Sequence, residues 1–384
     1  MKLVIVVLCA WVSICLSCAD PHPKECKKPK QPDPDSCLSL TCQQQEEVRK
    51  FDSLFDYLTK VNTFNGNVLV AEKGKIIYKK SFGVANSKEN KRLHDSSLFQ
   101  LASISKTITA ALTLKLVEEG KLNLEEDVSK YLPDFPYKGI SIKLLLSHRS
   151  GLGNYIYFSE SFVADKMKRL TNEEVYKIMV DHKPEIYLEP NKRFNYSNTN
   201  YMLLALICER ITKTNFKELA KQKIFDVCGM KNTFFADDAQ NNKNATIGYT
   251  YSMREVGGDI FDFVWGDKGV YTTTSDLFLF EEAYFNGKLI NDTLVQSAIQ
   301  PKNKERRLGN YGFGWRMKDF NSENKLVYHN GWWHGYRTAL QRRLKDDICV
   351  IILSNRLNSS VYQTQRLFKI IDADTSKVDA ADEF

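Results

Sequence analysis

The chain has 384 residues, of which 43% are hydrophobic, and a formal net charge of +7 at pH 7 from 54 Lys and Arg against 47 Asp and Glu. A chain of this length and composition can bury the core of one large domain or of two closely packed domains. Much of the positive excess is explained by a Lys-rich stretch between residues 24 and 30, and no long basic stripe with interleaved aromatic residues occurs. Nucleic acid is therefore excluded as the expected partner.

The N-terminus predicts an export signal over residues 1–18. Lys2 precedes an apolar run over residues 3–16, which is too short for a comfortable transmembrane helix. Cleavage before Cys18, within a loose lipobox, predicts membrane attachment through a lipidated Cys18, whereas cleavage after Ala19 predicts a soluble secreted protein. We favour the anchor, so the expected location is the periplasm or the cell surface.

Residues 19–45, rich in proline and lysine, are expected to form a disordered tether. An oxidising compartment can pair two of its cysteines, Cys26, Cys37 and Cys42. No set of cysteines has zinc spacing and the six histidines are scattered, so neither a metal nor a cofactor is expected. Three further cysteines have apolar neighbours and are expected in the core: Cys208, Cys228 and Cys349.

The next segments alternate between helical and strand patterns. A helix is predicted from Gln43 to Val61, followed by a hairpin of Gly66–Ala71 and Lys75–Lys79. A buried helix then begins near Ser103 and ends before Gly120. Further helices are predicted over Ile142–Ser147, Asn172–Asp181, Tyr201–Thr212, Phe216–Ile224 and Thr364–Ile371, and strands over Tyr311–Trp315, Lys325–His329, Arg337–Arg342 and Ile348–Ser354.

This order predicts an α/β (α+β) fold in which an antiparallel sheet is flanked by helices and interrupted by an all-α domain. We assign residues 46–136 to the first part of the α/β domain, 137–265 to the helical domain and 266–384 to the second part. A cleft between two such lobes is a usual ligand site.

Ser103 and Lys106 are the most informative residues of the chain. Residues three apart share one face of a helix, so the Lys106 amine can lie beside the Ser103 hydroxyl. A helix start also offers unpaired N–H groups that can stabilise an oxyanion. Ser322 and Lys325 have the same spacing, but they lie in a polar run with no buried helix behind them.

Two downstream motifs complete the candidate site. Tyr196 and Asn198 stand in a polar stretch before an apolar helix, where a tyrosine can carry a proton; a loop tyrosine that only bonds the backbone is the alternative, and Tyr284-Phe285-Asn286 repeats the spacing. His329 ends a predicted strand, and Gly331 leaves room for another molecule to approach the backbone. The alternative there is an aromatic-rich turn that packs the core, and for His334 we weigh such a turn equally with a functional role.

In this order, the three motifs resemble the serine β-lactamase and penicillin-binding protein superfamily, in particular its branch of class C β-lactamases, D-Ala-D-Ala carboxypeptidases and esterases. The resemblance runs from about Glu46 to the final helix and implies a β-lactamase/transpeptidase-like fold. Two further segments support it, Leu145–Leu152, which includes Ser147-His148-Arg149-Ser150-Gly151, and Gly266–Thr273.

The resemblance also implies roles. Ser103 would be the acylated nucleophile, and Lys106 and Tyr196 would share the base role. Asn198 would bond the substrate amide or Lys106. The backbone N–H groups of Ser103 and Trp332 would form the oxyanion hole, with His329 and Gly331 at the sheet edge.

The β-lactamase pattern has Lys-Thr-Gly where this chain has His329-Asn330-Gly331. A histidine is mostly neutral at pH 7, so recognition of a substrate carboxylate is expected to weaken unless Arg337 compensates. The Trp332-Trp333 pair is expected to narrow the cleft. Dedicated β-lactam hydrolysis is therefore disfavoured.

No Gly-x-Ser-x-Gly elbow and no His-Glu-x-x-His motif occurs, which disfavours other routes to hydrolysis. The expected function is a serine hydrolase that acts on peptide, amide or ester acyl groups of a small-molecule or peptide substrate. The alternatives are a penicillin sensor that acylates without efficient turnover, a β-lactamase, and a purely structural lipoprotein. Substrate choice depends on the segments around 155–168 and 259–264, and the sequence leaves the oligomeric state open.

Overall fold

The computed structural model describes residues 40–373 except 164, 166–167, 304–308 and 320. These residues belong to one of the two units into which the chain divides, Pro34–Phe384. The predicted export signal, most of the tether, and Cys26 and Cys37 lie outside the described residues. Among the residues that are described, no helix is long and apolar enough to cross a membrane.

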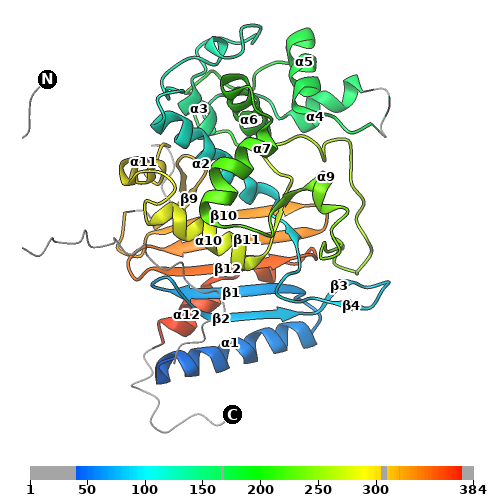
Figure 1. The fold of residues 1–384 in the computed structure, drawn as a ribbon, viewed down its shortest axis with the longest axis vertical. Helices are drawn as coiled ribbons and strands as arrows, with labels where there is room; N and C mark the ends of the chain where they lie inside the picture. The colour runs from blue at the N-terminus through cyan, green and yellow to red at the C-terminus, as the bar shows by residue number, and fades with distance from the viewer. Residues whose placement is uncertain (1–39, 164, 166–167, 304–308, 320, 374–384) are drawn as a thin grey trace, which may run out of the picture. The chain divides into compact units, whose positions relative to one another are not determined.

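A seven-stranded antiparallel sheet joins the two ends of this unit (Figure 1). Its strand order is β2-β1-β12-β11-β10-β9-β8. The hairpin near the start of the unit meets the last strand of the sheet in antiparallel register, with Gly66 opposite Ser354. The strands are β1 (Gly66–Glu72), β2 (Lys75–Phe82), β8 (Gly309–Tyr311), β9 (Arg316–Lys318), β10 (Leu326–Trp333), β11 (Tyr336–Arg343) and β12 (Ile348–Ser354).

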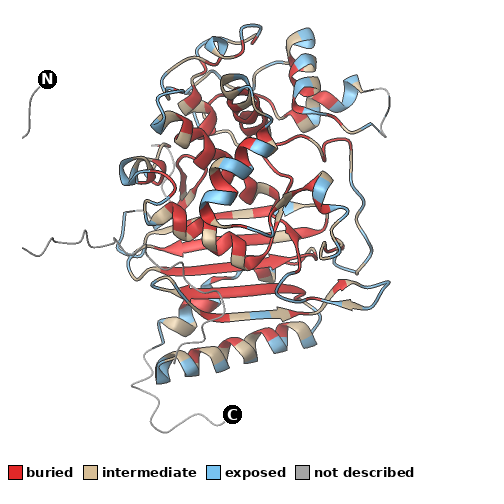
Figure 2. Ribbon diagram, viewed as in Figure 1, coloured by how far each residue is buried: buried red, intermediate tan, exposed pale blue. Residues whose placement is uncertain are grey.

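The central strands are buried on both faces, as Figure 2 shows. Along β1, Val68 and Val70 join one hydrophobic cluster while Leu69 and Ala71 join another, because successive side chains of a strand point to opposite faces. The first cluster packs against α1 (Cys42–Lys60) and α12 (Gln365–Ile371). The second packs against α2 (Ser105–Glu118) and α10 (Thr274–Phe285). The antiparallel sheet flanked by helices is therefore confirmed.

Most of the remaining helices lie between α2 and β7 in the sequence, and α3 to α6 lie together on the side of the sheet away from α1 (Figure 1). The three cysteines predicted in the core, Cys208, Cys228 and Cys349, are all buried. These helices are α3 (Ile142–Leu146), α4 (Tyr155–Ser159), α5 (Asn172–His182), α6 (Asn198–Thr212), α7 (Phe216–Ala220), α8 (Asp226–Cys228) and α9 (Ala236–Ala239), and α11 (Asp292–Ala298) follows α10. Short strands complete the fold: β3 (Val84–Asn86), β4 (Lys91–Arg92), β5 (Phe99–Gln100), β6 (Phe234–Phe235) and β7 (Val270–Thr272).

Two predicted strands need correction. The strand predicted to end at His329 continues to Trp333 as β10. Tyr311–Trp315 is not continuous, because β8 ends at Tyr311 and β9 begins at Arg316. Gly314 has φ +82°, and a Cβ at Gly312 would come within 1.8 Å of the Ala298 carbonyl oxygen. The two glycines therefore form a turn in which no bulkier residue would fit.

Two helix boundaries also differ from prediction. Helix α6 begins at Asn198 rather than Tyr201, so Asn198, a residue of the Tyr-x-Asn motif, lies in its first turn. The segment predicted as one helix over Phe216–Ile224 is α7 followed by a π-helical stretch, Lys221–Phe225.

Candidate active site

Ser103 lies in a 3-10 turn, Ala102–Ile104, that leads directly into α2. Ala102 has φ +50°, a left-handed conformation that non-glycine residues rarely adopt. Such a conformation costs of order 1–3 kcal/mol and persists where the surrounding structure fixes it, often at functional sites. The turn holds the Ser103 side chain at the N-terminal end of a 14-residue helix, where the helix dipole favours developing negative charge.

Lys106 is fully buried, and its amine meets the candidate nucleophile. Lys106 Nζ lies 3.1 Å from Ser103 Oγ and donates to the Asp267 carbonyl oxygen at 2.9 Å. It also lies 5.1 Å from the ring centroid of Tyr196. The structure therefore places the Ser103 hydroxyl, the Lys106 amine and the Tyr196 ring close together, as the sequence predicted.

Three buried polar residues, Tyr155, Asp267 and Lys268, hold the backbone carbonyl that accepts the Lys106 hydrogen bond. Asp267 and Lys268 form an ion pair of 3.1 Å with exposed side-chain fractions of only 1% and 3%. Tyr155 contacts both of them, donating to the Asp267 carboxylate at 3.1 Å. Burial lowers the pKa of Lys268 while Asp267 opposes the shift, and burial next to Asp267 holds the pKa of Tyr155 well above its usual range. This group makes the Asp267–Lys268 backbone a rigid support.

The Tyr196 ring lies between the Lys106 amine and the Arg316 guanidinium. Lys106 Nζ and the Arg316 guanidinium carbon lie 5.1 Å and 5.0 Å from its ring centroid. The ring also packs on His148, with centroids 4.2 Å apart. Burial, together with the charges of Lys106 and Arg316, holds the pKa of His148 well below its usual range, so its imidazole is neutral. The Tyr196 ring is therefore held between the amine that contacts Ser103 and the Arg316 guanidinium.

Asn198 is half-buried, and its Oδ1 is buried without a hydrogen-bond partner among the described residues. The two hydrogen bonds of the Lys106 amine go to Ser103 and Asp267 rather than to Asn198. The sequence suggested two partners for Asn198, Lys106 and a substrate amide. Because Lys106 bonds elsewhere, Asn198 Oδ1 is free to bond a substrate amide.

Strand β10 lies directly against the turn of Ser103. A Cβ at Gly331 would come within 2.2 Å of the Leu101 carbonyl oxygen and 3.1 Å of Ala102 Cβ. Gly331 therefore permits the close approach that brings the backbone of residues 331–332 next to the nucleophile. The Trp332 side chain is 63% exposed.

His329 is fully buried and does not reach solvent. Its Nδ1 lies 2.9 Å from the Asn330 carbonyl oxygen, so Nδ1 is the donor and Nε2 accepts from the Tyr311 hydroxyl at 3.1 Å. Burial, helped by Arg316 and Lys106, holds the pKa of His329 well below its usual range. A neutral His329 packs beneath the site and cannot serve as the cation that lysine provides in the β-lactamase pattern.

The structure thus brings Ser103, Lys106 and Tyr196 together and places the Gly331–Trp332 backbone beside them. Sequence reasoning missed Arg316, because it stands in no pattern that points to a site. His148, Asp267 and Lys268 lie in segments that were noted only as family likenesses, and their burial beside the site could not be deduced from local sequence.

Comparisons with known proteins identify the family of the chain. Residues 51–374 match the Beta-lactamase family, so the chain belongs to that family. Penicillin-binding protein 4* of Bacillus subtilis is 34% identical over 340 residues, covering 83% of this chain and 74% of the relative.

Two solved structures share the fold. A penicillin-binding protein from Bacillus halodurans superposes with a TM-score of 0.73 at 23% identity, covering 82% of this chain and 98% of that one. A D-amino acid amidase from Ochrobactrum anthropi gives 0.68 at 20% identity, with coverage of 86% and 98%. The predicted β-lactamase/transpeptidase-like fold is therefore confirmed.

Proposed function

We propose that the protein is a serine hydrolase that forms an acyl-enzyme on Ser103 from peptide, amide or ester substrates. The observation that carries the proposal is the 3.1 Å contact between Ser103 Oγ and the buried Lys106 amine. A serine hydroxyl is weakly nucleophilic until a neighbouring base takes its proton.

In the first step, Ser103 Oγ attacks the substrate carbonyl carbon while its proton passes to Lys106 or Tyr196. The backbone N–H groups of Ser103 and Trp332 stabilise the resulting oxyanion. As the carbon–nitrogen or carbon–oxygen bond breaks, the same proton passes to the leaving group by way of Tyr196. Water then attacks the acyl carbon, one of its protons returns to Ser103 Oγ as the ester bond breaks, and the carboxylic acid leaves. Asn198 Oδ1, which is unpaired among the described residues, accepts a hydrogen bond from the substrate amide.

An alternative carboxylate site supports peptide-like substrates. Arg316 and Arg337 line a cavity of about 340 Å³ beside β10, and Arg316 also packs on Tyr196. Guanidinium groups bind carboxylates by paired hydrogen bonds. We propose that Arg316 takes the role that the neutral His329 cannot, which suits a substrate with a free carboxylate, such as a D-amino peptide. Arg337 lies opposite Trp332, on the face of the sheet away from Gly331. The family likeness to a D-amino acid amidase, which shows the fold alone, is compatible with this preference.

The second candidate is a penicillin-binding sensor that acylates Ser103 and releases product slowly. Its support is the 34% identity to a penicillin-binding protein. Export of the chain, with an anchor at Cys18, also remains a proposal, because that segment lies outside the described residues.

Turnover on a panel of esters, D-amino acid amides and penicillins tests the proposal. We expect multiple turnovers by the wild type with at least one ester or amide, and none by Ser103→Ala. Ser322→Ala is the matched control, because Ser322 is an exposed serine with the same spacing to a lysine. Stoichiometric acylation without product release would favour the sensor, and turnover by Ser103→Ala would contradict both.

A further inference from the structure

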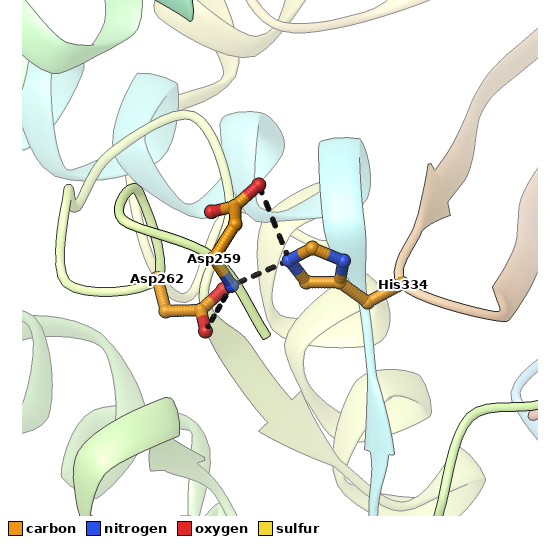
Figure 3. Close-up of side chains that lie close together, drawn as sticks. All are labelled: Asp259, Asp262 and His334. Atoms are coloured by element: carbon orange, nitrogen blue, oxygen red, sulfur yellow. Dashed lines mark hydrogen bonds and ion pairs between the residues drawn. The ribbon is translucent and has the colours of Figure 1, made fainter. Parts of the chain in front are cut away.

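One nitrogen of the His334 imidazole, Nε2, meets the carboxylates of Asp259 and Asp262 (Figure 3). This atom is 2.9 Å from Asp262 Oδ1 and 3.6 Å from Asp259 Oδ2. Asp262 and His334 are largely buried, with exposed side-chain fractions of 8% and 17%. The pair of aspartates belongs to the 257–264 loop, whereas His334 begins the turn between β10 and β11.

The backbone of this turn is unusual for histidine. His334 has φ +40° and Gly335 has φ +85°, the two left-handed residues of a tight hairpin turn in which Asn, Asp or Gly usually precedes Gly. A Cβ on Gly248 would come within 1.9 Å of the His334 carbonyl oxygen, so the turn is packed tightly. A histidine here carries a conformational cost, which the contacts of its imidazole with two carboxylates offset.

The loop and the turn each reach the catalytic groups. His334 follows Trp333, whose ring centroid lies 5.0 Å from Lys268 Nζ. The Trp332 N–H, a proposed oxyanion donor, lies two residues before His334 in the chain. Phe261 in the loop packs against Tyr155, with ring centroids 5.5 Å apart. Tyr155 in turn bonds Asp267, whose carbonyl receives Lys106.

We propose that His334 is a positioning residue, which ties the 257–264 loop to the end of β10 and so fixes the Trp332 N–H and the support of Lys106. The inference rests on the proposed function, since it concerns the geometry of the same site.

The charge on His334 makes the tie dependent on pH. Burial lowers the pKa of His334, but the two carboxylates outweigh it and raise the pKa from 6.5 to about 9. The stabilisation is therefore complete below about pH 6.5 and is lost as pH rises through about 9. Above that pH, the two carboxylates face each other, and the described cations that balance them are Arg169, 3.4 Å from Asp262, and Lys268. The other titratable groups nearby are Tyr155 and Tyr271.

A divalent cation is the other candidate occupant, because the three donor atoms lie within 4.8 Å of one another. The contacts favour the proton. Asp262 Oδ2 already accepts from the Asp259 backbone N–H at 3.0 Å and faces Arg169. A metal ion would also have to displace the proton that both carboxylates hold on the imidazole.

The test compares wild type with His334→Gln, which removes the charge, and His334→Lys, which keeps it to higher pH. We expect His334 to titrate near pH 9 by NMR of the imidazole, assigned from its loss in His334→Gln. With p-nitrophenyl acetate and the buffer rate subtracted, the Gln variant should lose on the order of tenfold in kcat at pH 7, with KM little changed, because a displaced oxyanion donor acts in the transition state. The ratio of wild type to Gln variant should fall toward one above pH 10, while His334→Lys retains activity there.

His182→Gln is the matched control, because His182 is exposed and packs only on Phe162 among the described rings. Titration of His334 near 6.5, or a wild-type to Gln ratio that does not change with pH, would overturn the inference. So would a rise in Tm with Zn²⁺ at pH 7.5 that is absent in His334→Gln, since the residue would then be a metal ligand. If the wild type does not react at Ser103 at all, the proposed function is wrong, and that outcome differs from a failure of the role of His334.

Discussion

The chain contains two Ser-x-x-Lys segments, and their surroundings differ. In the first, Ser103 Oγ lies 3.1 Å from a fully buried lysine amine. In the second, Ser322 is exposed and its hydroxyl donates to the Asp319 carbonyl oxygen at 2.9 Å. The Lys325 backbone N–H donates to the Ser322 carbonyl oxygen at 3.2 Å, which forms a turn. The same spacing therefore produces a candidate catalyst only where a helix start, a buried amine and a second chain segment meet.

The largest contrast is expected at the serines. Ser103→Ala should lower kcat by on the order of 10⁴-fold or more, because the nucleophile is lost. Ser322→Ala should leave kcat within error of wild type. Steady-state kinetics on one substrate, with Tm as the check on folding, decides this; equal losses in both variants would erase the distinction between the two segments.

The lysines extend the contrast. Lys106→Ala should lower kcat by on the order of 10²–10⁴-fold, the range for loss of a positioned general base. Lys325→Ala should change kcat little, since its amine has no bond to Ser322 among the described residues. Single-turnover acylation rates measure the step concerned. An active Lys106→Ala variant would assign the base role to Tyr196 alone.

The two Tyr-x-Asn segments give the next comparison. Tyr196→Phe should lower kcat by on the order of 10²-fold, because the proton carrier is removed while the ring stays. Tyr284 is fully buried and its hydroxyl has no partner in the described part of the chain. Tyr284→Phe should therefore keep activity and leave the free energy of unfolding unchanged or higher. Kinetics with urea unfolding of both variants measures the difference.

The smallest effect is expected on stability. Gly331→Ala should lower the free energy of unfolding by about 1–3 kcal/mol, because its Cβ would overlap the backbone beside Ser103. Gly257 has nothing within 4 Å of an added Cβ, so Gly257→Ala is the control and should be neutral or slightly stabilising. Urea unfolding curves for the two variants test whether β10 and the Ser103 turn are in contact.

Local patterns predicted much of the fold. Ile348–Ser354 was predicted with the bounds that β12 has, because a short continuous apolar run rich in β-branched residues is typical of a strand buried on both faces. The Tyr311–Trp315 prediction failed because it followed the three aromatic residues and not the two glycines between them, which the turn requires. Periodicity describes which side chains are buried, but it does not describe where the backbone must bend.

The candidate site divides in the same way. Ser103, Lys106 and Tyr196 stand in ordered motifs with recognisable flanks, so their convergence could be predicted. Arg316 stacks on Tyr196 from a strand 120 residues further along the chain, and no local signal marks it. His334 looked like a turn residue, and it is one; only the fold shows the two carboxylates around it.

The account depends on Ser103 being the residue that reacts. Peptide mapping by tandem mass spectrometry, after treatment of the full chain with a fluorophosphonate probe and with benzylpenicillin, tests this directly. We expect a single adduct on the peptide that contains Ser103, and its loss in Ser103→Ala but not in Ser322→Ala. An adduct on another serine, or no adduct with either reagent, would contradict the account.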